Sequence, residues 1–210
     1  MGRPVENGNP VGAGCGGRAP VKTIAVDLDD TLNDFTATLR SANFPADPRY
    51  PLPDAVFKDY LARVRDGATD SSELLVTEYS FFRQRIHLQC YQLAGARPDG
   101  VAFMRWLKSA GWRIVICSSR DLRRAGPATR AWLGENSIPF DHLFMAANKI
   151  AFCRAWDIPH LVDDDVFTII HGPRYGVKVY YPCMDKHRSL AGGGARGFAS
   201  FEEVRRWIQE

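Results

Sequence analysis

The stretch Thr23-Ile-Ala-Val-Asp-Leu-Asp-Asp-Thr-Leu32 decides the fold of this chain and the place of its chemistry. Its apolar start predicts a buried strand that carries Asp27 and Asp29 at its end. Alternate residues of a strand face the same side. Two like charges held close repel each other, so such a pair normally has a cation between its members or keeps one member protonated. The alternative is a solvated turn, because Asp is common where strands end and Thr31 can cap a helix.

Composition limits the classes of protein to consider. The 210 residues, 45% of them hydrophobic, suffice for one buried core and a small helical accessory region, not for two large domains. The formal charge of +3 is too small to indicate nucleic-acid binding. A helix face in water is the simpler explanation for the locally basic run Arg120, Arg123, Arg124 and Arg130. We therefore expect no nucleic-acid partner, and the sequence gives no indication of an oligomeric state.

Cysteine usage and hydropathy indicate the compartment. The five cysteines are far apart and form no CxxC pair, which argues against a disulfide framework or a zinc site. No stretch approaches the roughly 20 apolar residues of a membrane span. Residues 1–20 lack the apolar core of a secretory signal, and their Gly- and Pro-rich composition predicts a flexible N-terminal tail. These features predict a cytoplasmic protein without a membrane partner.

Apolar runs alternate with amphipathic stretches along the rest of the chain. Between 54 and 93 the pattern is amphipathic and contains no convincing strand, which predicts a helical insertion. Continuous apolar strands separated by helices indicate a parallel sheet covered on both faces, an α/β fold. We predict strands at 21–28, 112–117, 142–145, 160–162 and 177–181, and helices at 31–42, 99–110, 122–136, 148–156 and 201–208, with Gly111 as a C-cap.

Polar residues gather where the predicted strands end. In open parallel sheets, ligands bind outside the carboxyl ends of the strands. Carboxylates that converge there with one lysine suit a hard cation and an anionic substrate, and Mg²⁺ prefers oxygen ligands. A carboxylate beside Mg²⁺ can attack phosphorus, while a second one protonates the leaving oxygen. The strand-end residues are Asp27 and Asp29, then Ser118, Ser119 and Arg120, then Asp163, Asp164 and Asp165, with Lys149 at the start of a helix.

In this order, the motifs Asp27-Leu-Asp-Asp-Thr31, strand-Ser118, Lys149 and strand-Asp163-Asp164 resemble the haloacid dehalogenase-like (HAD) superfamily of phosphohydrolases. The resemblance spans about 21–181. It implies that Asp27 is the nucleophile, that Asp29 is the general acid and base, and that Ser118 and Lys149 bind the transferring phosphoryl group. It further implies that Mg²⁺ is held by Asp27, the backbone carbonyl of Asp29, and Asp164, with Asp163 as a ligand or beside one. In the run of three aspartates, a shift by one residue would bring in Asp165.

The same resemblance implies a Rossmann-like parallel sheet, the HAD fold, with a helical cap inserted after the first strand. The α/β core is then 21–32 and 96–210, and the cap is 33–95. A helical cap of this size suits a small phosphorylated substrate rather than a folded protein.

The string from Asp27 to Phe35 is similar to the 5′(3′)-deoxyribonucleotidases. That similarity implies that Phe35 packs against a base and that Ser119 joins Ser118 near the phosphate. Arg120, which follows the serine pair, is the third expected substrate-binding residue. Asp30 stands where that group usually has Gly. The alternative for Phe35 is a helix residue that packs against the cap.

Several functions remain open at this point. A Mg²⁺-dependent phosphomonoesterase acting on a nucleoside monophosphate is the first, and one acting on a sugar phosphate is the second. The others are a nucleic-acid end phosphatase and a phosphate-binding regulator without activity. The five histidines show no metal-ligand spacing, and Cys117 within a strand is expected to be inert. We expect core packing rather than a pocket for the cap residues Tyr79, Phe81, Phe82, Arg83 and Arg85, and a turn at 192–194.

Overall fold

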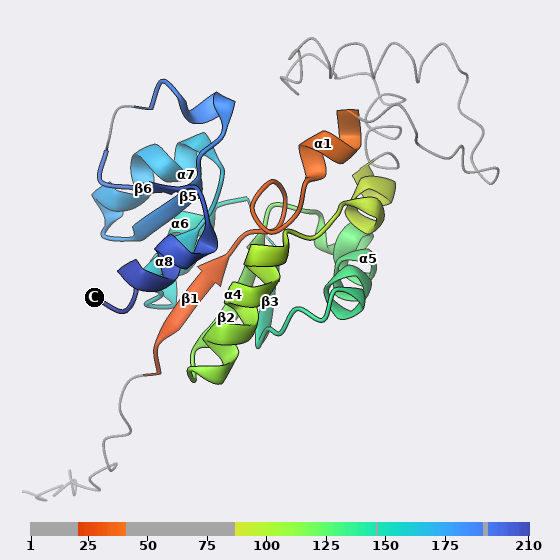
Figure 1. Ribbon diagram of the computed structural model, residues 1–210, viewed down its shortest axis with the longest axis horizontal. Coiled ribbons are helices and arrows are strands. Elements are labelled where there is room, and N and C mark those ends of the chain that lie inside the picture. Colours follow the sequence, from red (N-terminus) through yellow and green to blue (C-terminus); the bar gives the residue numbers. More distant parts are fainter. Residues whose placement is uncertain (1–20, 41–86, 146, 191–192) are drawn as a thin grey trace, which may run out of the picture.

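The computed structural model describes residues 21–40, 87–145, 147–190 and 193–210 (Figure 1). The predicted tail 1–20 and residues 41–86 of the predicted cap lie outside the described residues, together with the aromatic and arginine residues predicted as core within that cap. No helix in the described part of the chain combines the length and the apolar character that crossing a bilayer requires.

The described strands form a single parallel sheet in the order β3-β2-β1-β4-β5-β6. This topology confirms the predicted α/β class. The first strand lies inside the sheet, with Val26 opposite Ile116 on one side and Val162 on the other. The strands are β1 (Thr23–Val26), β2 (Arg113–Ser118), β3 (His142–Met145), β4 (His160–Val162), β5 (Lys178–Pro182) and β6 (Arg196–Phe198).

Helices cover both faces of the sheet, as a buried parallel sheet requires (Figure 1). Ile24 and Val26 point into one core cluster, which includes side chains of α4, α5 and α8. Ala25 points to the opposite face, into a second cluster with side chains of α6 and α7. The helices are α1 (Phe35–Arg40), α4 (Pro98–Ser109), α5 (Leu122–Glu135), α6 (Lys149–Ala155), α7 (Val166–His171) and α8 (Phe201–Trp207).

The predicted elements match the structure closely, with four additions. Gly111 follows α4 with φ of 77°, the left-handed conformation of a C-cap, which confirms its predicted role. The sequence reading missed α7, β6 and two short 3-10 turns, η2 (Gly172–Tyr175) and η3 (Asp185–His187). The extra strand extends the sheet beyond β5, and η3 brings its side chains to the carboxyl edge.

The chain leaves and re-enters the core at one point. Asn33 and Ala96 form an isolated antiparallel bridge. Asp34 N donates to the Gly95 carbonyl at 3.1 Å, and Arg97 N donates to the Leu32 carbonyl at 2.8 Å. The ends of the predicted cap segment 33–95 are therefore held side by side at the carboxyl edge of the sheet.

Candidate active site

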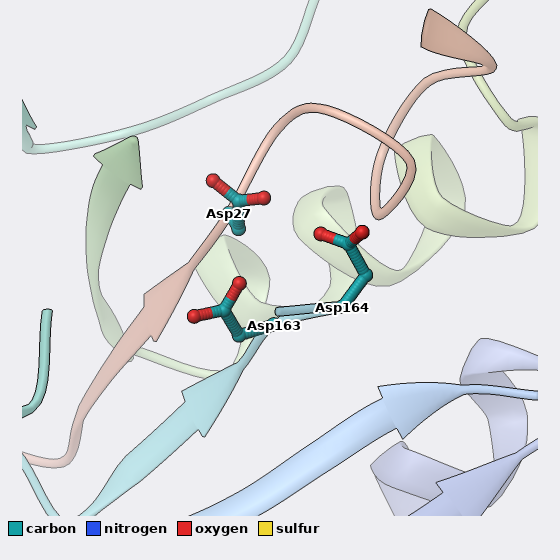
Figure 2. A group of neighbouring side chains, drawn as sticks. All are labelled: Asp27, Asp163 and Asp164. Carbon is teal, nitrogen blue, oxygen red and sulfur yellow. The ribbon is translucent and has the colours of Figure 1, made fainter. Parts of the chain in front are cut away.

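Three aspartates meet where β1 and β4 end (Figure 2). The two strands are neighbours in the sheet, and Asp27 N donates to the Val162 carbonyl at 2.9 Å. Asp27 therefore lies next to Asp163 and Asp164, although they are far apart in the sequence. Their exposed fractions are 3%, 0% and 8%. The continuous apolar strands thus carry the aspartates into a buried position at the sheet edge.

The three carboxylates form a candidate cation site. One oxygen from each lies within 4.8 Å of the other two. Two oxygens bound to one Mg²⁺ at about 2.1 Å lie at most about 4.2 Å apart, so small side-chain rotations suffice to close the set around an ion. Asp163 Oδ2 is buried and has no hydrogen-bond partner among the described residues. A buried polar oxygen normally has one, so this atom fits an all-oxygen site for a hard cation.

Lys149 is buried against two of these aspartates. Its Nζ lies 2.8 Å from Asp27 Oδ1 and 2.8 Å from Asp163 Oδ1. Lys149 is the first residue of α6, which Asn148 caps by accepting a hydrogen bond from Ala151 N at 2.9 Å. Burial opposes the charge on the ammonium, but the attraction of the two carboxylates outweighs it and raises the pKa of Lys149. The lysine is therefore a fixed cation between two of the aspartates.

The pKa values of the carboxylates Asp27 and Asp163 are also shifted. Burial raises the pKa of Asp27 well above its ordinary value, and the pKa of Asp163 is raised for the same reason. Lys149 lowers both pKa values, and the neighbouring aspartates raise them. A divalent cation bound here would offset the burial and the mutual repulsion that raise these pKa values.

Asp29 lies apart from this cluster and pairs with Arg120. Arg120 Nε donates to Asp29 Oδ2 at 2.9 Å, and Nη2 donates to Oδ1. Asn33 Nδ2 adds a third hydrogen bond, to Oδ1 at 3.2 Å. The Arg120 side chain is buried, and its Nη1 donates to Thr129 Oγ1 at 2.9 Å. The arginine expected to bind substrate thus has three of its donors on protein atoms.

The other expected substrate-binding residues occupy different environments. Ser118 ends β2 in a buried position, and its Oγ accepts a hydrogen bond from Arg120 N at 3.3 Å. Ser119 is exposed. The Phe35 ring stacks on Tyr91 with a centroid distance of 5.3 Å and meets His87 edge-on at 5.2 Å. These contacts are those of the alternative interpretation, a residue that packs against the cap, and the role of Phe35 toward a base stays a prediction.

Asp164 has partners that sequence reasoning missed. Lys186 of η3 forms an ion pair with its carboxylate, and Thr31 Oγ1 donates to its Oδ1 at 3.4 Å. His187 is buried, with its ring nitrogens 2.7 Å from the Pro182 carbonyl and 2.8 Å from the Asp164 carbonyl. No local pattern signals these contacts, because they depend on where η3 folds back. The His187 ring is thus held between two backbone carbonyls, outside the three-carboxylate set.

The remaining aspartates of the two motifs have structural roles. Asp165 caps α7, accepting hydrogen bonds from Thr168 N at 2.9 Å and Thr168 Oγ1 at 3.1 Å. The Asp165 carboxylate is thus used by the helix cap and is not part of the three-carboxylate set. Both facts favour Asp163 and Asp164, rather than Asp165, as the candidate metal ligands. Asp30 adopts φ of 57°, a conformation that Gly takes readily and that Asp tolerates. Its carboxylate accepts a hydrogen bond from Thr36 N at 2.7 Å and ties this turn to α1.

The described cysteines and histidines add no ligand to this set. Burial raises the pKa of the Cys117 thiol, which is consistent with the inert packing expected for it. The basic side chains of Arg123, Arg124 and Arg130 are exposed around α5, as expected for a helix face in water. The prediction is wrong for Arg120, the fourth member of that run, which precedes α5 and is buried against Asp29.

The fold and the site together define an α/β protein with a Rossmann-like parallel sheet and an acidic centre at its carboxyl edge. Solved structures of HAD-superfamily hydrolases share this fold. The chain is similar to CbbY from Rhodobacter sphaeroides in complex with phosphate (16% identity, 88% of this chain and 96% of that chain, TM-score 0.58). It is also similar to a haloacid dehalogenase-like family hydrolase from Streptococcus pneumoniae (16%, 90% and 99%, TM-score 0.58). A third similar structure is a predicted phosphoglycolate phosphatase from Haemophilus somnus (18%, 92% and 100%, TM-score 0.55). No family model and no curated protein matched the sequence.

Proposed function

We propose that this chain is a Mg²⁺-dependent phosphomonoesterase that hydrolyses a small phosphorylated metabolite through an aspartyl-phosphate on Asp27. The observation that carries the proposal is the buried set of Asp27, Asp163 and Asp164 beside Lys149 at the carboxyl edge of the sheet. All its donors are carboxylate oxygens, the ligands that Mg²⁺ prefers. The similarity to a structure in complex with phosphate supports the same substrate class.

The first chemical step transfers the phosphoryl group to the protein. A carboxylate oxygen of Asp27 attacks phosphorus and forms a new P–O bond, while the bond between phosphorus and the ester oxygen breaks. Asp29 gives its proton to the departing oxygen, so that the product leaves as an alcohol. When bound, Mg²⁺ supplies positive charge beside the phosphoryl oxygens and lowers the repulsion that an anionic nucleophile meets.

The second step releases phosphate. Asp29, now ionised, takes a proton from water, and the water oxygen attacks phosphorus and restores the Asp27 carboxylate. Lys149 is placed to keep Asp27 oriented through its 2.8 Å contact with Oδ1, and Ser118 ends the neighbouring strand as a donor for a phosphoryl oxygen. Buried cations of this kind stabilise transition-state charge because they need no reorganisation.

A nucleoside monophosphate is the first candidate substrate, on the similarity of residues 27–35 to the deoxyribonucleotidases. A phosphorylated sugar or small acid is the second, and the similar structure described as a predicted phosphoglycolate phosphatase favours it. The residues that select between these classes are expected in the cap segment.

The test is phosphate release from a panel of nucleoside monophosphates, sugar phosphates and phosphoglycolate, with Mg²⁺ and with EDTA. We expect wild-type turnover that EDTA abolishes and that Asp27→Asn reduces to the blank, because the amide lacks the attacking charge. Asp185→Asn is the matched control, since that side chain is 90% exposed and its ion pair in the described part of the chain is with the exposed Arg188. Equal turnover by wild type and Asp27→Asn would reject Asp27 as the nucleophile. Phosphate binding without any turnover would favour the regulator.

A further inference from the structure

Arg120 is built into the protein as a rigid group. Its guanidinium contacts Asp29 through Nε and Nη2, Thr129 through Nη1, and the ring of Tyr91, whose centroid lies 3.9 Å from Cζ. Its exposed fraction is 3%. Arginine presents its donors in a fixed planar fork, so two bonds to one carboxylate set the orientation of that carboxylate as well as its position.

The two hydrogen bonds from the Arg120 guanidinium leave one lone-pair site on Asp29 Oδ2 available. A carboxylate offers about four lone-pair sites. Among the described residues, Asp29 Oδ1 accepts from Arg120 and Asn33, whereas Oδ2 accepts from Arg120 Nε alone. The remaining site on Oδ2 is held in one direction as long as the fork is in place. This is the oxygen that can carry a proton toward a leaving group.

The geometry points to Arg120 as the positioning residue of Asp29. Arg120 orients Asp29 Oδ2 toward the leaving-group oxygen, and its contact with Tyr91 couples this orientation to the predicted cap. This inference rests on the phosphomonoesterase function proposed above. Tyr91 lies in the helical stretch 87–93, within the predicted cap, and its ring also stacks on Phe35 of α1. A shift of this stretch therefore moves the surface on which the guanidinium rests.

Leaving-group dependence separates positioning from general damage to the fold. Phenyl phosphate and p-nitrophenyl phosphate have nearly the same shape, but phenolate needs a proton donor more than p-nitrophenolate does. The ratio kcat/KM reports the steps up to departure of the leaving group. General acid catalysis contributes about 10²- to 10⁴-fold. We therefore expect Arg120→Lys, which keeps the charge and loses the fork, to lower kcat/KM at least about tenfold more for phenyl phosphate than for p-nitrophenyl phosphate.

Two matched comparisons accompany this variant. Arg124→Lys makes the same change at an exposed position and should leave both values unchanged. Tyr91→Leu should shift the ratio in the direction of Arg120→Lys, because it removes the ring on which the guanidinium rests. Equal losses for both esters in Arg120→Lys, or no loss, would overturn the inference.

A crystal structure of Arg120→Lys provides a readout that needs no turnover. We expect the Asp29 carboxylate to leave its single orientation, and an unchanged orientation would also overturn the inference. If wild type hydrolyses neither ester nor any member of the panel above, the proposed function fails, and the orientation of Asp29 in the variant still decides the role of Arg120.

Discussion

Lys149→Met removes the buried cation and keeps most of the side-chain volume. In wild type, the ammonium lies 2.8 Å from both Asp27 Oδ1 and Asp163 Oδ1, and the three side chains are at most 5% exposed. The variant therefore leaves two buried carboxylates facing each other. With no cation added, at least one of them must take up a proton that it does not hold in the unfolded chain.

The loss of unfolding free energy can be worked out from the uptake of that proton. At an effective dielectric constant of about 20, each ion pair at this distance is worth about 6 kcal/mol before desolvation is counted. Protonation limits the loss, because a carboxyl group with an unfolded pKa of 3.8 is neutralised at pH 7 for about 4 kcal/mol. This value lies within the roughly 3 to 5 kcal/mol found when one partner of a buried pair is removed. We expect Lys149→Met to lower the free energy of unfolding by about 4 kcal/mol at pH 7.

The pH dependence of this loss identifies its cause. The orphaned carboxyl group has a raised pKa in the folded state, so the folded variant binds a proton that the unfolded variant lacks, and its stability falls as pH rises. Because Lys149 holds the pKa values of Asp27 and Asp163 below those in the variant, the difference from wild type should shrink as pH falls from 7, by up to about 1.4 kcal/mol for each pH unit.

Urea unfolding in EDTA at several pH values measures this difference. Lys186→Met is the control, because the Lys186 side chain is 42% exposed and solvent weakens its ion pair with Asp164, so the loss should be clearly smaller than for Lys149→Met. A loss below about 1 kcal/mol for Lys149→Met, or one that does not change with pH, would refute the electrostatic argument.

Three further predictions concern other parts of the structure. Burial lowers the pKa of His160 to about 4, so the neutral ring contributes stability above pH 6.5 that is lost as pH falls toward 4. Relative to wild type, His160→Phe should therefore gain up to about 3 kcal/mol of unfolding free energy between pH 7 and pH 4, as measured by urea denaturation. A Cβ at Gly172 would lie 2.4 Å from Val179 Cγ2, so Gly172→Ala should cost about 1 to 3 kcal/mol, and a double-mutant cycle with Val179→Ala should show favourable coupling. Lys186→Met removes a cation from Asp164 and should tighten Mg²⁺ binding by up to about fivefold, measured by the Mg²⁺ dependence of the melting temperature; weaker binding would contradict this.

The sequence predicts the central elements well because their signals are local. The strands at 142–145 and 160–162 have the predicted bounds, since short apolar runs there lie between turn residues. Helix α7 was missed because Asp165 belongs to a run of aspartates interpreted as metal ligands, whereas its carboxylate caps the helix that follows. Strand β6 was missed because Arg-Gly-Phe is three residues long and its glycine is unfavourable in a strand.

The candidate site divides in the same way. Asp27 and Asp163 could be placed together from the sequence, because each follows a buried strand and parallel strands end at one edge. The partner of Asp29 could not, since Arg120 lies 91 residues further along the chain. Lys186 was equally hidden, because its approach to Asp164 depends on a turn of η3 that no motif announces. Long-range polar pairs of this kind are set by tertiary packing rather than by local pattern.

The bridge between Asn33 and Ala96 bears on how this protein can be re-engineered. Antiparallel partners lie about 5 Å apart, so the chain leaves and re-enters the α/β core at neighbouring positions. Segments joined in this manner are those at which domain insertion succeeds. A foreign cap with closely spaced ends is therefore suited to grafting at this position, which would change what reaches Asp27 without redesign of the sheet beneath it.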